Sequence, residues 1–388
     1  MRKLADRLDS ITSFHVMVLM EQAQQLEQQG RDIIHLEVGE PDFATPPSVV
    51  AAGVRAMESG NTRYTTALGL PALREAISGF YQTRFGIEVP ASRILITPGA
   101  SGAIGLLNGL LFNACDGVLL TDPGYPCNDN FLHLVGAQPQ RIAVGADTAY
   151  QLSAGLVQQH WQSNTRAAWV ASPSNPTGTV IPPAEMAAIK QVVDAQQGAL
   201  LVDEIYHCLV YGQSPETVLA LPDKQDSLFV INSFSKYFNM TGWRLGWLVA
   251  PEQHVRDLEK LAQNFYLAAP TVAQHAALAA FSEESLAIYE ERRGIMGRRR
   301  DFLLQSLPEL GISIACAPQG AFYIYCDVSA VTDNSFDFCQ QLLNGCGVAV
   351  TPGIDFGNHQ AERHIRIAYS ASMERLQEAI DRIATFIA

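Results

Sequence analysis

A lysine lies within an apolar stretch of the chain, INSFSKYFNMTGWRLGW, which spans residues 231–247. Aromatic residues bound Lys236 on both sides, and they are Phe234, Tyr237 and Phe238. Apolar surroundings disfavour the ammonium form, so the pKa of this lysine should be lowered, and its free amine can form a Schiff base with an aldehyde. Arg244 follows eight residues later, and Ser233 and Ser235 precede the lysine. A fixed guanidinium with hydroxyls suits a phosphate dianion, so the stretch predicts a ligand that carries an aldehyde and a phosphate.

Further polar clusters follow apolar runs elsewhere in the chain. TPGASGAI, residues 97–104, would aim backbone N–H groups and Ser101 at an anion, although ordinary turn chemistry gives the same pattern. DPGYP places Tyr125 where its ring could lie over a flat ligand. Asn175 in SPSNPTG and Asp203 in DEIY stand 28 residues apart, and each alone could be a turn residue or a satisfied carboxylate. Together these clusters indicate one site, and an aldehyde, a phosphate and a flat ring suggest pyridoxal phosphate.

Short β-rich runs that alternate with helical patterns should position these clusters. The predicted strands are 93–97, 117–122, 138–144, 166–172, 199–204, 227–233 and 245–250. Most are apolar throughout, which is typical of parallel strands covered on both faces by helices. In such an open α/β sheet, ligands bind beyond the carboxyl ends of the strands, which is where the polar clusters lie.

The rest of the chain predicts a second, smaller unit. A helical tract runs from about residue 251 to about residue 307, and strands at 322–328 and 364–370 precede a terminal helix from Met373. The N-terminal helix and strand, to about Phe43, should pack with this α+β unit. We therefore expect an α/β large domain with a mostly parallel sheet at 44–290, which binds the cofactor, and a small domain formed by 1–43 and 291–388.

Composition narrows the class of protein. Among 388 residues, 48% are hydrophobic and 17% charged, which is typical of an ordered globular chain. The net charge of −13 argues against nucleic acid or an acidic membrane as the main partner, and the arginine run at 292–300 is interpreted as a solvated helix face. Seven scattered cysteines without a C-x-x-C pair argue against a disulfide framework or a metal site. The N-terminus fits no signal peptide and no apolar run would span a membrane, so a cytoplasmic protein is predicted.

The chain resembles the class I/II aminotransferases, the pyridoxal-phosphate enzymes of fold type I that include aspartate aminotransferase. SFSKYFNMTGWRLG fits the lysine-site pattern of that family, including the arginine eight residues on. The other matches occur in the family's order, and they are LEVGEPDF, RYTTALGLPALREAI, TPGASGAI, DPGYP, SNPTG, DEIY and RIAYS. The resemblance therefore covers the chain from about residue 30 to residue 370.

This resemblance implies a role for each cofactor-binding residue. Lys236 would form the Schiff base and then act as the acid/base that moves the substrate proton. Asp203 would pair with the pyridinium nitrogen, Tyr206 and Asn175 would bond the ring oxygen, and Tyr125 would stack on the ring. The phosphate would be held by Ala100, Ser101, Ser233, Ser235 and Arg244, together with Tyr64 of a neighbouring subunit in a homodimer.

The substrate carboxylate would be bound by Arg366, helped by the backbone N–H at Gly39 and by Asn175. Arg366 alternates with apolar residues in HIRIAYS, so it points to the opposite face of that strand from them; an ordinary exposed strand arginine is the alternative. The implied reaction moves an amino group from an L-amino acid to a 2-oxo acid. No second cation is evident near these motifs, which favours neutral or aromatic donors, with 2-oxoglutarate or pyruvate as acceptor.

Two other functions are weighed against aminotransfer. A β-lyase acting on C–S bonds would use the same residues on the same fold, because all of them serve removal of the Cα proton. A transcriptional regulator with this fold would need a basic helix-turn-helix domain ahead of LEVGEPDF, and about 35 residues leave no room for one.

Overall fold

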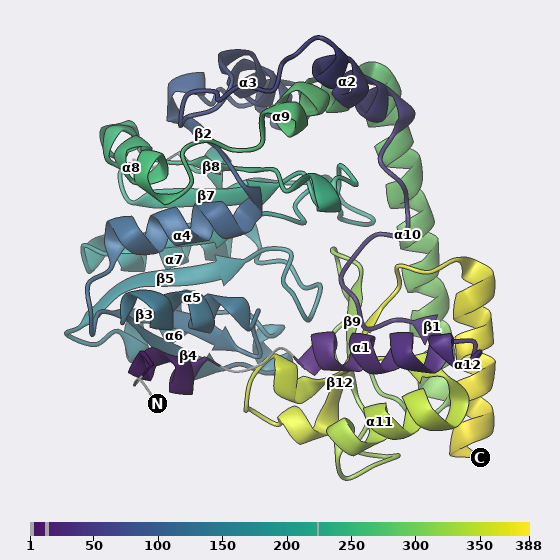
Figure 1. The fold of residues 1–388 in the computed structure, drawn as a ribbon. Coiled ribbons are helices and arrows are strands. Elements are labelled where there is room, and N and C mark those ends of the chain that lie inside the picture. Colours follow the sequence, from purple (N-terminus) through teal and green to yellow (C-terminus); the bar gives the residue numbers. More distant parts are fainter. Residues whose placement is uncertain (1–3, 12–14, 223–224) are drawn as a thin grey trace.

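The computed structural model describes residues 4–11, 15–222 and 225–388 of the chain. Residues 1–3 and 12–14, which belong to the predicted small domain, lie outside the described residues. The largest sheet has seven strands in the order β2-β8-β7-β6-β5-β3-β4 (Figure 1). They are β2 (Ile94–Thr97), β3 (Gly117–Asp122), β4 (Gln138–Ala143), β5 (Thr165–Ala171), β6 (Ala199–Asp203), β7 (Leu228–Ser233) and β8 (Gly246–Val249). Each corresponds to one predicted apolar run, so this part of the prediction is confirmed.

Strand β8 is antiparallel to both of its neighbours, β7 and β2, whereas the other pairings in the sheet are parallel. The connection from β7 to β8 contains only residues 234–245 and no α-helix, so the chain reverses instead of crossing over the sheet. This reversal places Lys236 and Arg244 on one loop at the same end of the sheet.

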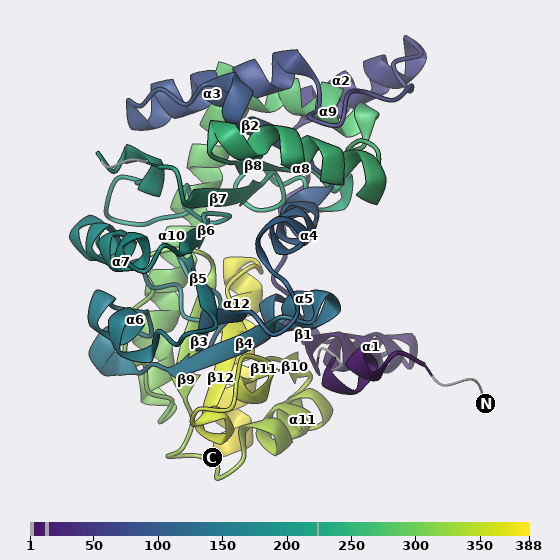
Figure 2. The same ribbon diagram turned by 90° about the vertical axis from the view of Figure 1, so that its left-hand side faces the viewer.

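Helices cover both faces of the large sheet (Figure 2). On one face α4 (Gly99–Leu111), α5 (Cys127–Val135) and α8 (Glu252–Phe265) pack against alternate strand residues such as Trp169 and Leu201. On the other face α3 (Pro71–Phe85), α6 (Ala154–His160) and α7 (Pro183–Ala195) pack against the intervening residues, including Val170 and Val202. Because both faces are buried, the strands are apolar throughout, as expected of an interior sheet.

A smaller α+β unit lies beside the large sheet. Its antiparallel sheet has the order β11 (Thr351–Pro352), β12 (His364–Ala368) and β9 (Tyr323–Asp327). A second sheet pairs β1 (Ile34–His35) with β10 (Val348–Ala349), which follows α11 (Ser335–Cys346) in the chain. The surrounding helices are α1 (His15–Gln28), α11 and α12 (Met373–Ile387). The predicted α/β class is confirmed.

Helix α10 (Glu283–Glu309) runs along both units (Figure 1), and α2 (Pro47–Glu58) and α9 (Thr271–Leu278) lie near its N-terminal end. The predicted division between residues 290 and 291 falls inside this continuous helix. The domain boundaries therefore stay a prediction.

The interpretation of the arginine run on α10 as a solvated helix face is wrong at Arg299, although Arg298 in the same run is exposed. Arg299 is only 4% exposed and pairs with Asp42 at 2.7 Å. The guanidinium groups of Arg292 and Arg299 each lie 5.1 Å from the ring centroid of Phe43. The flanking acidic residues suggested solvent exposure, but the loop at 39–43 covers the helix there, and α10 anchors that loop.

The described part of the chain contains no helix that is long and apolar enough to cross a membrane. All seven cysteines are free thiols.

Candidate active site

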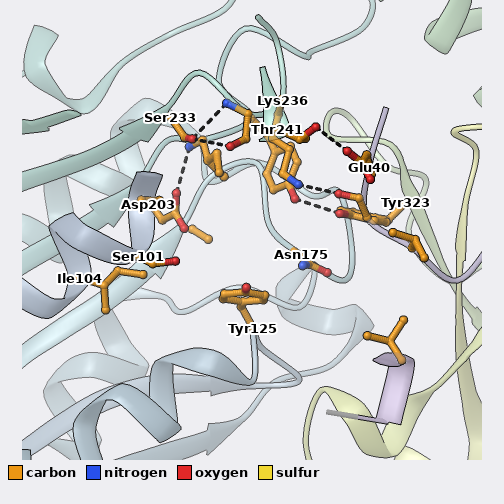
Figure 3. A pocket seen from close by; sticks show the side chains of 18 of the residues that line it. Glu40, Ser101, Ile104, Tyr125, Asn175, Asp203, Ser233, Lys236, Thr241 and Tyr323 are labelled. Atoms are coloured by element: carbon orange, nitrogen blue, oxygen red, sulfur yellow. Dashed lines mark hydrogen bonds between the residues drawn. The ribbon is translucent and has the colours of Figure 1, made fainter. Parts of the chain in front are cut away.

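A cavity of about 430 Å³ lies at the carboxyl ends of β5, β6 and β7, between the large sheet and the small unit (Figure 3). Twelve of the thirteen predicted site residues line it: Gly39, Ala100, Ser101, Tyr125, Asn175, Asp203, Tyr206, Ser233, Ser235, Lys236, Arg244 and Arg366. Tyr64 does not line it, and its side chain is 81% exposed on the surface of the chain. Residues from every predicted motif except that of Tyr64 are therefore brought together.

The amine of Lys236 faces this cavity from the loop after β7. Its Nζ donates a hydrogen bond to the Gly39 carbonyl at 2.5 Å and lies 5.9 Å from the Phe322 ring centroid. Desolvation, aided by the charges of Arg366 and Arg244 and opposed by Glu40, lowers the pKa of Lys236 to about 8. About a tenth of the amine is then unprotonated at pH 7, far more than for an ordinary lysine, and this free amine is the form that acts as a nucleophile.

The predicted fall in this pKa is confirmed, but the aromatic neighbours of Lys236 in sequence are not what line its amine. Phe234, Tyr237 and Phe238 turn away from the cavity into the hydrophobic core, where Phe234 and Phe238 pack with ring centroids 5.1 Å apart. They pack the loop into the core, and the ring that lies near the amine itself is that of Phe322.

Asp203 ends β6 and is 8% exposed. Its carboxylate accepts a hydrogen bond from the Ile205 backbone N–H at 3.0 Å. Burial raises the pKa of Asp203 to about 6, against the opposing effects of that hydrogen bond and of Lys236. The group is thus largely ionised at neutral pH, and a buried carboxylate with so few donors is suited to a cationic N–H.

An anion cradle is formed where α4 begins beside the β7–β8 loop. A Cβ at Gly99 would come within 2.7 Å of Arg244 Nη2, and a Cβ at Gly246 would come within 2.9 Å of the Ala100 nitrogen. Gly99 also has φ +67°, a conformation that favours glycine. These two glycines let the arginine and the N–H groups of the helix start approach one another, a combination that binds phosphate groups.

Two serines complete the cradle. Ser233 and Ser235 are buried, and their Oγ atoms lie 3.0 Å apart. On the opposite side of the cavity from Lys236, the Tyr125 ring presents its face (Figure 3). The space between is suited to a flat ring with a phosphate at one end.

Arg366 lies at the small-unit side of the cavity and is 2% exposed. Its guanidinium donates to Asn175 Oδ1 at 2.9 Å and to the Glu37 carbonyl at 2.5 Å, both neutral acceptors. The group lies between two rings, 4.3 Å from the Tyr323 centroid and 4.8 Å from the Phe356 centroid. A cation buried among neutral partners favours an anionic ligand such as a carboxylate.

Several lining residues were missed by the sequence prediction. Tyr323 lies at the start of β9, and its hydroxyl group forms a hydrogen bond of 2.9 Å with the hydroxyl group of Tyr206. Glu40 accepts a hydrogen bond from the hydroxyl group of Thr241. The apolar part of the wall is formed by Val16, Met17, Val38, Ile104 and Phe131. Glu40 belongs to the motif LEVGEPDF, so that motif could have identified it as a lining residue. No local sequence pattern predicts that the N-terminal helix packs against this cavity.

The relatives found by comparison with known proteins are aminotransferases. A model of the aminotransferase class I and II family matches residues 31–383. A valine–pyruvate aminotransferase of Mycobacterium tuberculosis is 38% identical over 97% of both chains. A crystal structure of an aminotransferase from that organism has a TM-score of 0.96 at 38% identity, covering 100% of this chain and 99% of the other. Aspartate aminotransferase from Thermus thermophilus with maleate has a TM-score of 0.92 at 30% identity, with both chains fully covered (100%).

Proposed function

This chain belongs to the class I and II aminotransferase family, and from that premise we propose that it uses pyridoxal 5'-phosphate, held as a Schiff base on Lys236, to move an amino group from an L-amino acid to a 2-oxo acid. The observation that carries the proposal is the meeting of three charged groups in one cavity: the Lys236 amine, the Asp203 carboxylate and the Arg366 guanidinium.

The cavity fits this cofactor. A Cβ at Gly99 would come within 2.7 Å of Arg244 Nη2, so glycine keeps the anion cradle open there, and the amine of Lys236, with its lowered pKa, lines the same cavity. Asp203 would hold a proton on the ring nitrogen. When bound, the cofactor supplies an aldehyde for the amine and a ring that accepts the electron pair left by a departing Cα proton.

The chain's own residues then position the substrate and move its proton. Arg366 and the Gly39 N–H would bind the α-carboxylate, which fixes the Cα–H bond relative to Lys236. Lys236 Nζ would take up the Cα proton as general base and return it as general acid, a role suited to an amine with a pKa of about 8. Tyr206 and Asn175 would hold the ring oxygen, and Tyr125 would cover the ring face.

We propose neutral aliphatic or aromatic amino donors, with pyruvate or 2-oxoglutarate as acceptor. The cations among the described lining residues are Lys236, Arg244 and Arg366, and each already has a role in this scheme. The remaining wall is apolar at Val16, Met17, Ile104 and Phe131. The name of the M. tuberculosis relative, a valine–pyruvate aminotransferase, agrees with such a donor.

A half-transamination screen tests this function. Cofactor-loaded protein is mixed with each of the twenty amino acids without an acceptor, and the loss of the visible absorbance is followed. We expect neutral aliphatic or aromatic donors to react at least about tenfold faster than aspartate or glutamate, because an apolar pocket discriminates by roughly 1–3 kcal/mol. No absorbance change with any donor would contradict the proposal. So would release of pyruvate and ammonia from cystathionine without a 2-oxo acid, which is the β-lyase outcome.

We also infer a homodimer in which Tyr64 of each subunit reaches the partner's phosphate. In support, α2 exposes Val50, Val54 and Met57 at a helical spacing along one side, and Phe265 and Leu267 are exposed as well. Exposed apolar side chains gathered on one side of a helix commonly mark a protein interface. Sedimentation equilibrium should give twice the chain mass of 42.3 kDa, and a fully active monomer would rule the dimer out.

The cytoplasm remains the proposed location, and small molecules the proposed partners. The net charge of −13 and the free thiols of all seven cysteines support this.

A further inference from the structure

The hydroxyl groups of Tyr206 and Tyr323 form a buried pair in the wall of the cavity. Their oxygens are 2.9 Å apart, and their rings meet edge to face with centroids 5.7 Å apart. The side chains are 4% and 1% exposed. Burial raises the pKa of both hydroxyls above the usual value, so both keep their protons at neutral pH. Each hydroxyl has a single proton, so only one of them can donate within the pair.

The position of Tyr323 is closely constrained. The Arg366 guanidinium lies 4.3 Å from the centroid of its ring. On another side, a Cβ at Gly39 would come within 2.2 Å of the Tyr323 hydroxyl, so the glycine lets this hydroxyl lie against the chain. The hydroxyl of Tyr206 is its hydrogen-bond partner in the described part of the chain. The proton of Tyr323 therefore has one acceptor there, the oxygen of Tyr206.

We propose that Tyr323 is a positioning residue, whose hydroxyl donates to Tyr206 and thereby directs the Tyr206 proton toward the ring oxygen of the cofactor. The inference rests on the proposed function, because it needs that oxygen as the acceptor. Without the hydroxyl of Tyr323, the Tyr206 hydroxyl loses the partner that orients it, and its donation to the cofactor weakens. Tyr323 thus acts on the cofactor through Tyr206, without a bond of its own to it.

The pKa of the Lys236 nitrogen in its linkage to the cofactor measures this effect. A hydrogen bond donated to the ring oxygen stabilises the negative charge there while the nearby nitrogen is unprotonated. Weakening that bond favours the protonated nitrogen and raises its pKa. The visible absorbance of the loaded protein changes as this nitrogen titrates, so the value is read from a pH titration and not from activity.

The test compares loaded wild-type protein with Tyr323→Phe, Tyr206→Phe and the double variant. Tyr323→Phe keeps the ring, and we expect the pKa of the linkage nitrogen to rise by about 0.5–1 unit, since a hydrogen bond to a charged group is being weakened. Tyr206→Phe should raise it at least as far. The double variant should match Tyr206→Phe, because Tyr323 has no separate route to the cofactor.

Tyr325→Phe is the matched control. Tyr325 is on the same strand as Tyr323 and is 4% exposed, but it does not line the cavity. The substitution removes one buried hydroxyl group there and should leave the titration unchanged. A rise of less than about 0.2 unit in Tyr323→Phe, when Tyr206→Phe shifts the titration, would overturn this inference alone. So would additive shifts in the double variant. A wild-type protein that gains no visible absorbance with pyridoxal phosphate would overturn the proposed function as well.

Discussion

Lys236→Ala is expected to abolish covalent capture of the cofactor and to lower the rate of amino transfer by at least about 10³-fold. The variant loses both the amine that attaches the cofactor and the group that moves the Cα proton, and acid–base catalysis alone is worth about 10²–10⁴-fold. Borohydride reduction followed by intact mass measurement reads out the first effect, and single-turnover transfer from a donor reads out the second. The anion cradle and Asp203 remain in the variant, so it should still bind the cofactor without a covalent bond.

Lys260→Ala is the control for this experiment, because Lys260 is exposed on α8, away from the cavity. It should give the wild-type adduct. A reduced adduct at wild-type level in Lys236→Ala would show that another amine attaches the cofactor.

The pH dependence of capture by the wild-type protein gives an internal check. With a pKa of about 8, the free-amine fraction of Lys236 rises about tenfold between pH 7 and pH 9 and then levels off. An ordinary lysine, with a reference pKa of about 10.4, would show a rate that is still rising steeply at pH 9. The initial rate of capture should therefore reach a plateau near pH 9 if the cavity sets the pKa of this amine.

The strands of the large sheet could be predicted because each buried strand is a local run of apolar residues. Each interior strand is apolar on both faces, and Asn175, Asp203 and Ser233 follow or end such strands. Carboxyl ends of parallel strands meet at one edge, so a linear pattern was enough to group these side chains. The antiparallel direction of β8 depends on the short loop before it and was not predicted.

The parts of the site that were missed depend on contacts between distant segments. Tyr323 meets Tyr206 across 117 positions of the chain, and Val16 and Met17 reach the cavity from the N-terminal helix. The same limit explains the wrong interpretation of Arg299, whose partner Asp42 is 257 positions away. A charged side chain in a polar run is usually solvated, and only tertiary structure shows the exception.

Arg366→Gln should raise the KM for the amino donor and lower kcat/KM by about 10²–10³-fold, because removing one partner of a buried charge pair costs about 2–5 kcal/mol. Glutamine cannot present two parallel donors to a carboxylate. Its shorter side chain also no longer fills the space that the guanidinium occupies between the Tyr323 and Phe356 rings. Arg366→Lys keeps the charge but not the planar fork, so an intermediate loss is expected. Steady-state kinetics across donor concentrations give both parameters for each variant.

A substrate comparison separates carboxylate binding from structural damage. For wild-type protein, an amino acid should be strongly preferred over the primary amine that has the same side chain but lacks the α-carboxylate. In Arg366→Gln this preference should largely disappear, because the group that recognises the carboxylate is gone while the wall around the side chain remains. Arg363→Gln is the control, since Arg363 is exposed and pairs with Asp327 at 2.8 Å, away from the cavity, and its loss should change kcat/KM by no more than about fivefold. If Arg366→Gln slowed both substrates equally, the arginine would be supporting the fold of the cavity and another group would be binding the carboxylate.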